Sequence, residues 1–119
     1  MSKKMTIGVG RLDETAARFV ETWRKAERGE KVARQERLTF DNLETLLRTL
    51  TPSRWTLLRT LRQKGPMTVR ALSKALERDY KNVHTDAGTL ERVGLLSRDK
   101  SGRVMVPWDT IVAEVRLAA

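Results

Sequence analysis

Residues 68–96 read TVRALSKALERDYKNVHTDAGTLERVGLL, and this stretch decides the fold. Its apolar residues recur at helical spacing in two short runs. Thr68 is suited to cap the first run, which we expect to end near Glu77, and Asp79 is suited to cap the second. Only about three residues around Arg78 separate the two predicted helices, and so tight a turn is typical of a helix-turn-helix.

The second helix of this pair has one apolar face and one polar face. Stepping round it at about 100° per residue places an apolar row of Val83, Ala87 and Leu90 on one side. The opposite side carries Lys81, Thr85, Gly88 and Arg92. Glycine in mid-helix costs up to about 1 kcal/mol relative to alanine. It either lets another molecule approach the backbone closely or lets a neighbouring helix pack closely.

The flanking sequence supplies the other parts of a winged helix-turn-helix. Thr51 and Pro52 are the cap and first residue of a further helix, which ends at Gly65. After Gly94 the period changes, and the short runs LLSR and RVMVP enclose the turn-rich tetrad DKSG, which fits a β-hairpin. The order helix, short helix, turn, helix, hairpin over residues 52–108 therefore predicts a winged helix-turn-helix.

Residues 1–51 form an extension before this module. Helical spacing predicts an amphipathic helix over residues 13–28 and a second helix from Phe40 to Leu50, capped by Thr39 or Asp41. The apolar side of this second helix comprises Phe40, Leu43, Leu46, Leu47 and Leu50. The fold class is thus mainly α with a small β component (α+β). We expect an N-terminal strand and helical extension over 1–51, the DNA-binding module over 52–108, and a C-terminal strand over 109–119.

Both ends of the chain show the period of two that is typical of strands. In TIVAEVRL, residues 110–117, apolar and polar positions alternate, which favours a strand over a short helix capped by Asp109. Ile7 and Val9 share one side of a short extended segment near the start. We expect Thr6–Gly10 and Thr110–Leu117 to pair with each other, or with their copies in a second subunit. The alternative is that both ends are frayed tails.

Charge points to an anionic partner. The 119 residues carry 24 Lys and Arg against 15 Asp and Glu, a formal net charge of +9, and residues 52–108 hold 12 of the basic residues against 5 acidic ones. Nucleic acid is the first expectation and an acidic membrane surface the second. The chain has no cysteine, no apolar run long enough to span a membrane and no hydrophobic leader, so we expect a cytoplasmic protein without disulfides or thiolate metal sites.

The predicted partner is double-stranded DNA. Base edges would be read from the recognition helix by Lys81, Asn82, His84, Thr85 and Gly88. Phosphates would be bound by Thr68, Arg70, Lys74, Arg92, Arg98, Lys100 and Arg103. Asp86 argues the other way, because a carboxylate repels phosphate, but its direction on the helix suits pairing with Arg78 or with a residue of the preceding helix.

No feature of the sequence supports catalysis, a cofactor or a bound metal. His84 is the only histidine, which excludes a histidine-rich metal site. The GVG at residues 8–10 lacks the third glycine of a dinucleotide site. Trp23, Trp55 and Trp108 occupy apolar positions and are expected in the core or at an interface.

The stretch LTPSRWTLLRTLRQKGPMTVRALSKALERDYKNVHTDAGTLERVGLL resembles prokaryotic winged-helix DNA-binding proteins that are grouped near the MarR-type transcriptional regulators. The resemblance extends to VPWD after the hairpin, to RLTF and to GRLDETAARF. It implies a transcriptional regulator, and some relatives act as antitoxins. Asp86 stands where MarR-type recognition helices have an apolar residue, and their long dimerising helices are missing, so their effector pocket and mode of dimerisation do not carry over.

We therefore expect a sequence-specific transcriptional regulator that binds DNA as a homodimer and represses its own operon. An antitoxin would use the same DNA-binding face and add a toxin as partner. An RNA-binding or non-specific architectural protein would bind random duplexes or single strands equally. A protein-interaction domain would touch no nucleic acid.

Overall fold

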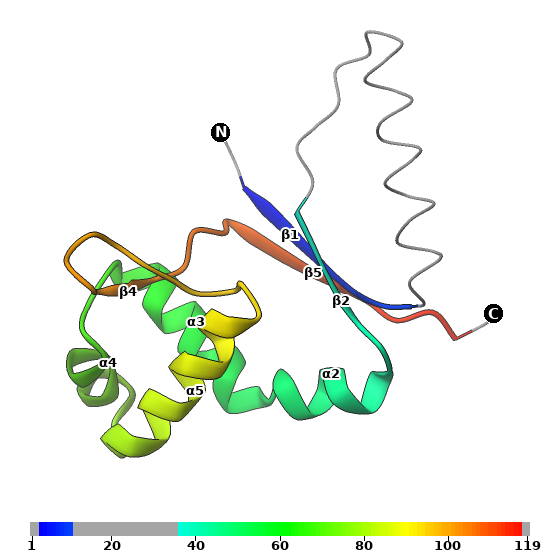
Figure 1. Ribbon diagram of the computed structural model, residues 1–119. Coiled ribbons are helices and arrows are strands. Elements are labelled where there is room, and N and C mark those ends of the chain that lie inside the picture. The colour runs from blue at the N-terminus through cyan, green and yellow to red at the C-terminus, as the bar shows by residue number, and fades with distance from the viewer. Residues whose placement is uncertain (1–2, 11–35, 118–119) are drawn as a thin grey trace, which may run out of the picture.

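The structure, a computed structural model, describes residues 3–10 and 36–117, so the predicted helix over residues 13–28 and Trp23 lie outside it. A three-stranded sheet packs against a group of helices with a small hairpin, and the described part is therefore an α+β fold (Figure 1). The elements in chain order are β1 (Lys4–Val9), β2 (Glu36–Phe40), α2 (Leu43–Thr49), α3 (Pro52–Lys64), α4 (Val69–Leu76), α5 (Tyr80–Arg92), β3 (Ser97–Arg98), β4 (Val104–Met105) and β5 (Thr110–Glu114).

β1 is the central strand of the sheet, and its neighbours β2 and β5 both run parallel to it. Register partners point to the same side of a sheet, so Met5 and Ile7 share a face with Leu38 of β2 and Ile111 of β5. Met5 and Ile7 are buried, and Leu38 and Ile111 pack against the same core that the helices contribute to. The sheet and the helical part thus share one hydrophobic core.

Short polar side chains set the starts of the helices. A side-chain oxygen of Thr51, Thr68 and Asp79 accepts a hydrogen bond from the backbone N–H three residues later, at 3.4, 3.1 and 3.3 Å. Pro52 opens α3, and Gly65, at φ 90°, follows its last residue. The three predicted caps and the predicted end of α3 are therefore confirmed.

The region before α3 differs from the prediction at its start. Phe40 is the last residue of β2 and not the first of a helix. α2 begins at Leu43, and its cap is Asn42, whose Oδ1 accepts a hydrogen bond from the backbone N–H of Thr45 at 2.8 Å. The predicted caps Thr39 and Asp41 are therefore wrong.

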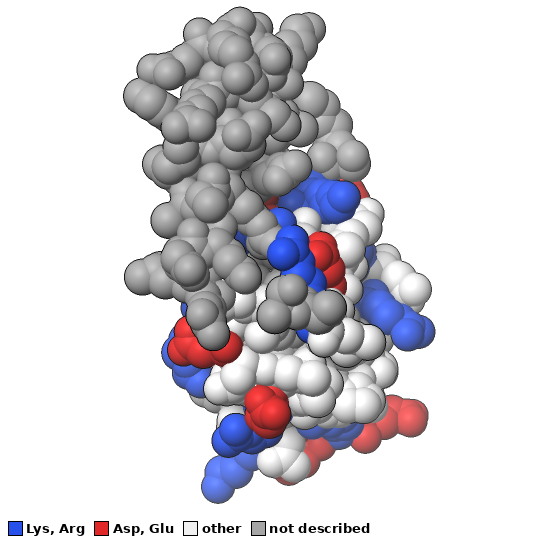
Figure 2. Space-filling view, turned by 90° about the vertical axis from the view of Figure 1, so that its right-hand side faces the viewer, with Lys and Arg blue, Asp and Glu red and all other residues white. Residues whose placement is uncertain are grey.

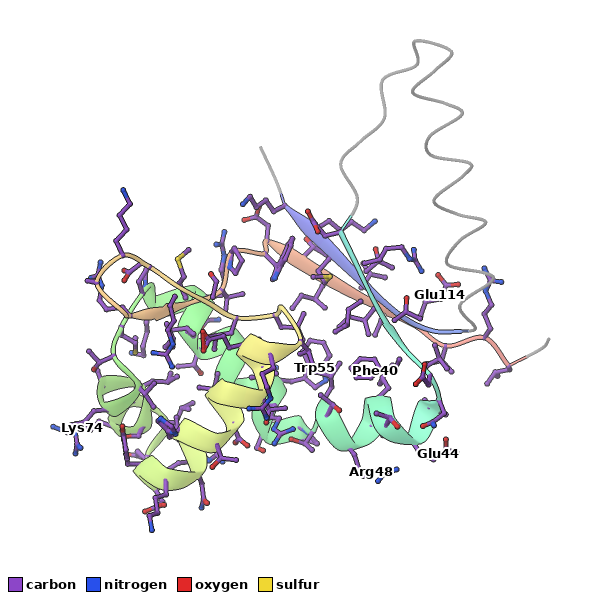
Figure 3. All side chains as sticks on the ribbon, viewed as in Figure 1. Phe40, Glu44, Arg48, Trp55, Lys74 and Glu114 are labelled. Carbon is purple, nitrogen blue, oxygen red and sulfur yellow. The ribbon has the colours of Figure 1, made fainter. Side chains whose placement is uncertain are left out.

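One side of α2 also differs from the prediction. Leu46 and Leu50 are buried as expected, but Leu47 is 60% exposed. The helix is shorter than predicted, so fewer of its apolar residues pack into the core. In Figure 3, Phe40 and Trp55 point into the space between the sheet and the helices, whereas Glu44 and Arg48 point outward from α2.

The predicted pairing of the two ends is confirmed within one chain. Residues 4–8 are register partners of residues 110–114 in a parallel ladder. The backbone N–H of Lys3 donates to Oδ2 of Asp109 at 2.7 Å, and the N–H of Asp109 donates to the carbonyl of Lys3 at 2.9 Å. The frayed-tail alternative is wrong for these segments, although β5 ends at Glu114 and the predicted strand to Leu117 is too long.

The predicted hairpin is confirmed, and it is tied to the helices. β3 and β4 pair antiparallel, and Val104 also pairs with Met67 in the connection between α3 and α4. The Nε1 of Trp108 donates to the carbonyl of Gly94 at 3.1 Å. Trp55 and Trp108 are half-buried against the core, and both line a groove of about 380 Å³ between α3 and the link from β4 to β5.

Candidate nucleic-acid interface

The corner between α4 and α5 brings the start of α5 to the surface. α4 ends at Leu76 because Glu77 adopts the left-handed conformation, with φ 54°. The backbone N–H of Arg78 then donates to the carbonyl of Ser73 at 3.0 Å, and Asp79 caps α5 directly afterwards. The turn is as tight as predicted.

The buried side of α5 is the predicted one. Val83, Ala87 and Leu90 are each at most 1% exposed. These side chains belong to the core that α4 also enters through Leu72. The side of α5 that faces away from the core is therefore fixed by packing.

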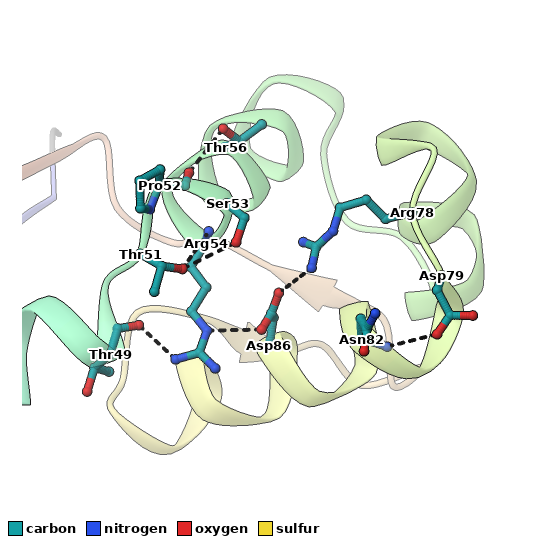
Figure 4. A network of polar contacts seen from close by, with 10 residues as sticks. All are labelled: Thr49, Thr51, Pro52, Ser53, Arg54, Thr56, Arg78, Asp79, Asn82 and Asp86. Carbon is teal, nitrogen blue, oxygen red and sulfur yellow. Dashed lines mark hydrogen bonds and ion pairs between the residues drawn. The ribbon is translucent and has the colours of Figure 1, made fainter.

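Asp86 is also buried on α5, and two arginines hold it there. Its Oδ1 accepts a hydrogen bond from Nε of Arg54 at 3.0 Å, and its Oδ2 accepts one from Nη2 of Arg78 at 2.7 Å (Figure 4). Arg54 also donates to the carbonyl of Thr49 at 2.9 Å. The predicted pairing of Asp86 with Arg78 is confirmed, whereas sequence analysis missed Arg54, which lies on α3.

This cluster decides how Asp86 affects an anionic ligand. The carboxylate side chain is 13% exposed, and the two guanidinium groups neutralise it. It joins α5 to α3 and to the α4–α5 turn. Asp86 is therefore a structural residue that fixes the position of α5, and its charge does not face solvent on the polar side of the helix.

That polar side gathers all of the predicted base-reading residues. Lys81, Asn82, His84 and Thr85 are exposed, and Gly88 is half-buried one turn further along. Their side chains offer an ammonium, an amide, an imidazole and a hydroxyl, which can donate or accept hydrogen bonds at base edges. The only acidic residue between Lys81 and Gly88 is the buried Asp86.

Gly88 lies in open surroundings. A Cβ added there would meet, within the described residues, only the end of the Arg92 side chain, with Nη1 at 3.8 Å. Such a distance is ordinary van der Waals contact. Within the described residues, close packing of a neighbouring helix therefore does not account for this glycine.

A surface cluster at the start of α5 was missed by sequence analysis. The guanidinium of Arg70, on α4, lies 4.7 Å from the centre of the Tyr80 ring, and the Tyr80 and His84 rings are 5.8 Å apart. Tyr80 is 39% exposed. The signal that could have found it is an aromatic residue in the first turn of a helix whose exposed face is otherwise polar. Arg70 is thus oriented by Tyr80 beside the predicted base-reading residues.

The predicted phosphate-binding residues other than Arg70 fall into two groups. In the described part of the chain no carboxylate pairs with Lys74, Lys100 or Arg92, and the same holds for Lys81. Lys74 points away from α4 into solvent (Figure 3). These cations are available to an anionic ligand without giving up an ion pair.

Thr68 and the two hairpin arginines have partners already. The hydroxyl oxygen of Thr68 caps α4. Arg98 pairs with Glu91 at 3.0 Å and donates to the carbonyl of Gly102 at 3.1 Å, and Arg103 pairs with Asp99 at 2.8 Å. The structure therefore brings the predicted basic residues to the hairpin, but their guanidinium groups are engaged.

Asp99 organises the tip of the hairpin. A hydrogen bond from the Ser101 hydroxyl, together with bonds from the backbone and guanidinium of Arg103, lowers the pKa of Asp99 to about 2. The carboxylate is thus ionised at neutral pH and holds the tip residues in place. Lys100, between these residues, is exposed, and no carboxylate of the described residues pairs with it.

Charges on the side of the molecule that carries α2 are mixed in sign. Figure 2 shows the side that carries α2 and the C-terminal end of the sheet, where Lys and Arg are interspersed with Asp and Glu among uncharged residues. This side offers no large surface of one sign in the part that the structure describes. Lys74, Lys81, Arg92 and Lys100 have no carboxylate partner in the described part of the chain, and the same holds for Lys4 on β1, Arg48 on α2 and Arg59 on α3.

A family model named HVO_A0114 matches residues 49–113, which include α3, α4, α5, the hairpin and most of β5. No curated protein and no solved structure matches the chain. Among the described residues, no group of three or more His, Cys, Asp and Glu is placed to hold a metal ion. No helix in that same part is both long and apolar enough to cross a membrane.

Proposed function

This chain belongs to the HVO_A0114 family, and we propose that it binds double-stranded DNA and regulates transcription. In this proposal residues 52–108 are a winged helix-turn-helix, with α5 as the recognition helix and the β3–β4 hairpin as the wing. The family match covers this whole module. The remaining segments, 1–51 and 109–119, would serve dimerisation.

The exposed face of α5 is the observation that carries the proposal. It presents Lys81, Asn82, His84 and Thr85 together, and the half-buried Gly88 follows one turn further along. Its one carboxylate over that stretch is turned inward and neutralised. A helix with donors and acceptors in its first turns and no exposed acid between Lys81 and Gly88 fits the major groove, where base edges offer a distinct pattern for each base pair.

Unpaired lysines supply the attraction to phosphate. Lys74 on α4, Lys81 on α5 and Lys100 at the hairpin tip are exposed and come from three different elements. Phosphate contacts of this kind position a protein on the duplex and contribute most of its salt-dependent affinity. We further propose that two copies bind two half-sites about one helical turn apart, and that the protein represses its own operon.

Fluorescence anisotropy with labelled nucleic acids over a series of salt concentrations tests this proposal. We expect tight binding to duplex DNA, weaker binding to single-stranded DNA and to double-stranded RNA, and a steep loss of affinity with salt. Equal binding to all three would favour an architectural or RNA-binding role. An absence of binding at low salt would contradict the proposal.

A matched pair of double variants identifies the surface. The K81A/K100A variant removes two unpaired cations of the proposed interface and should lower the salt slope by roughly 2. The K3A/R48A variant removes the same charge from two exposed residues, one directly before β1 and one on α2. It should leave affinity close to that of the parent protein, and an equal loss in both variants would contradict the assignment of the surface.

A further inference from the structure

β5 has one edge paired and one edge open. In the part of the chain that the structure describes, β5 pairs only with β1, so its outer edge presents unpaired backbone groups. Such an edge is a template for pairing with another strand. From Thr110 to Ala113 the strand also lacks the charged residues and proline that commonly protect an edge.

The hydrogen bonds at the start of β5 indicate which groups point outward. The backbone N–H of Thr110 donates to the carbonyl of Lys3, on the β1 side, at 3.3 Å. Successive residues of a strand direct their N–H and C=O groups to alternate edges. Val112 therefore faces β1 in the same way as Thr110, and Ile111 and Ala113 present both backbone groups at the open edge.

Exposed apolar side chains gather on the same segment. Val112 is 37% exposed, and Val115 and Leu117, just beyond β5, are 41% and 97% exposed. The other large hydrophobic side chains that the described part exposes are Leu47 and Tyr80, one on α2 and one on α5. The opposite edge strand, β2, has only its first residue exposed. The β5 edge is thus the more accessible of the two.

We propose that two copies of this chain pair through β5 in antiparallel orientation, with the two-fold axis at Val112. The inference rests on the homodimer of the proposed function and names its interface. Ile111 of each copy exchanges both backbone hydrogen bonds with Ala113 of the other, which satisfies every outward N–H and C=O within the strand. Val112 then lies against Val112 of the second copy, in the closer, non-hydrogen-bonded type of pair.

Charge favours this register over the one with its axis at Glu114. Lys4 is the register partner of Thr110 on one face of the sheet. With the axis at Val112, Glu114 of the second copy lies opposite Thr110, so its carboxylate joins the row that Lys4 begins. An axis at Glu114 would set two carboxylates directly opposite each other, which is unfavourable.

The same axis places both DNA-binding modules on one side of the joint sheet. An axis perpendicular to the sheet keeps the faces of Ile7 and Ile111 in both copies on the same side, and the helices pack against that face (Figure 1). Two recognition helices on one side suit an operator with two half-sites. Because a strand of this length buries little surface, we expect a weak dimer, with Kd roughly in the micromolar range.

Single cysteines test the contact directly, because the chain has none of its own. In V112C the two thiols lie across a pair whose Cα atoms are about 4.5 Å apart, which is within disulfide reach. In the matched control E114C, on the same exposed face, the two positions lie roughly 13 Å apart along the paired strands. Mild oxidation without DNA should convert V112C to a disulfide-linked dimer and leave E114C monomeric on a non-reducing gel.

A pair of lysine variants tests the contact without a covalent cross-link. V112K sets two like charges at the axis and should sediment as a monomer at concentrations where the parent protein is a dimer. T110K faces Glu114 of the second copy and should stay a dimer. The proposal is overturned by a monomeric parent protein, by E114C linking as fast as V112C, or by V112K remaining a dimer. All of these measurements omit DNA, so anisotropy judges DNA binding separately.

Discussion

The exposed face of α5 and the β3–β4 hairpin both carry basic residues that sequence analysis assigns to DNA, yet these residues differ in whether a carboxylate pairs with them. Lys81 on α5 has no carboxylate partner in the described part of the chain. Arg98 and Arg103 of the hairpin are tied to Glu91 and Asp99. Arg98 and Arg103 must therefore share or release an acid before they bind phosphate, whereas Lys81 need not.

The two carboxylates of α5 that carry ion pairs sharpen the same contrast. Asp86 is 13% exposed and joins two arginines, whereas Glu91 is 37% exposed and joins one arginine of the hairpin. Burial makes the first pair costly to break, and solvent weakens the second. We therefore expect α5 to be a rigid platform and the hairpin to be adjustable.

The largest expected effect is on stability. Asp86→Ala leaves the Arg54 and Arg78 guanidinium groups close together without their carboxylate, and should lower the free energy of unfolding by about 3 kcal/mol. Glu91→Ala, on the same helix, should cost at most about 1 kcal/mol because its pair is solvent-exposed. Urea unfolding of both variants measures the difference. Equal losses would show that the Asp86 cluster does not hold α5 in place.

A smaller effect separates the hairpin cations. Lys100→Ala should weaken binding to all duplexes alike and lower the salt slope by roughly 1, because this unpaired cation is lost outright. Arg98→Ala should lower the slope less, since Glu91 already neutralises part of that charge. Anisotropy at several salt concentrations gives both slopes. A larger drop for Arg98→Ala would contradict the comparison between paired and unpaired cations.

The substitution Gly88→Ala should raise stability and lower affinity for DNA. Gly88→Ala should raise the free energy of unfolding by up to about 1 kcal/mol, because alanine favours helix and, among the described residues, its Cβ meets only Nη1 of Arg92, at 3.8 Å. The same methyl group should weaken DNA binding if the duplex approaches the backbone here. Urea unfolding and anisotropy on one preparation check both signs. A stabilised variant with unchanged affinity would show that DNA does not approach Gly88.

The smallest effect concerns pH and the hairpin tip. The pKa of Asp99 is lowered to about 2, so its ionised form stabilises the folded hairpin above the unfolded pKa of about 4, and this stabilisation is lost as the pH falls through 2. The Asp99→Asn variant lacks it at every pH. The difference in urea midpoint between the parent protein and this variant should be constant above pH 5 and shrink toward pH 2. A difference that does not change with pH would contradict the role of Asp99.

The parts of the fold that sequence analysis predicted are those whose signals are local. Thr51, Thr68 and Asp79 each cap a helix through an N–H only three residues later, and the turn at Arg78 follows from two adjacent periodic runs. The strands near the two ends of the chain could be predicted from the alternation of apolar and polar residues alone. β2 was missed because ERLTF offers only Leu38 and Phe40 as apolar residues, and its pairing with β1 spans a long stretch of sequence.

The candidate site shows the same division. The exposure of Lys81, Asn82, His84 and Thr85 follows from the helical period, and all four are exposed in the structure. The partners of the arginines come from tertiary packing, so Arg54, which reaches Asp86 from α3, could not be inferred from spacing. For the same reason sequence analysis assigned the hairpin arginines to phosphate and did not predict their ion pairs with Glu91 and Asp99.

Selection of bound DNA from a random duplex pool, followed by sequencing, tests the central claim that α5 reads bases. At one fixed salt concentration the parent protein should enrich two half-sites about one helical turn apart. Asn82→Ala, His84→Ala and Thr85→Ala should each relax preference at individual base pairs, by roughly 1–3 kcal/mol for a good contact, whereas Lys100→Ala should keep the same motif at lower affinity. If the three α5 variants enrich the same motif as the parent protein, α5 is not the reading element.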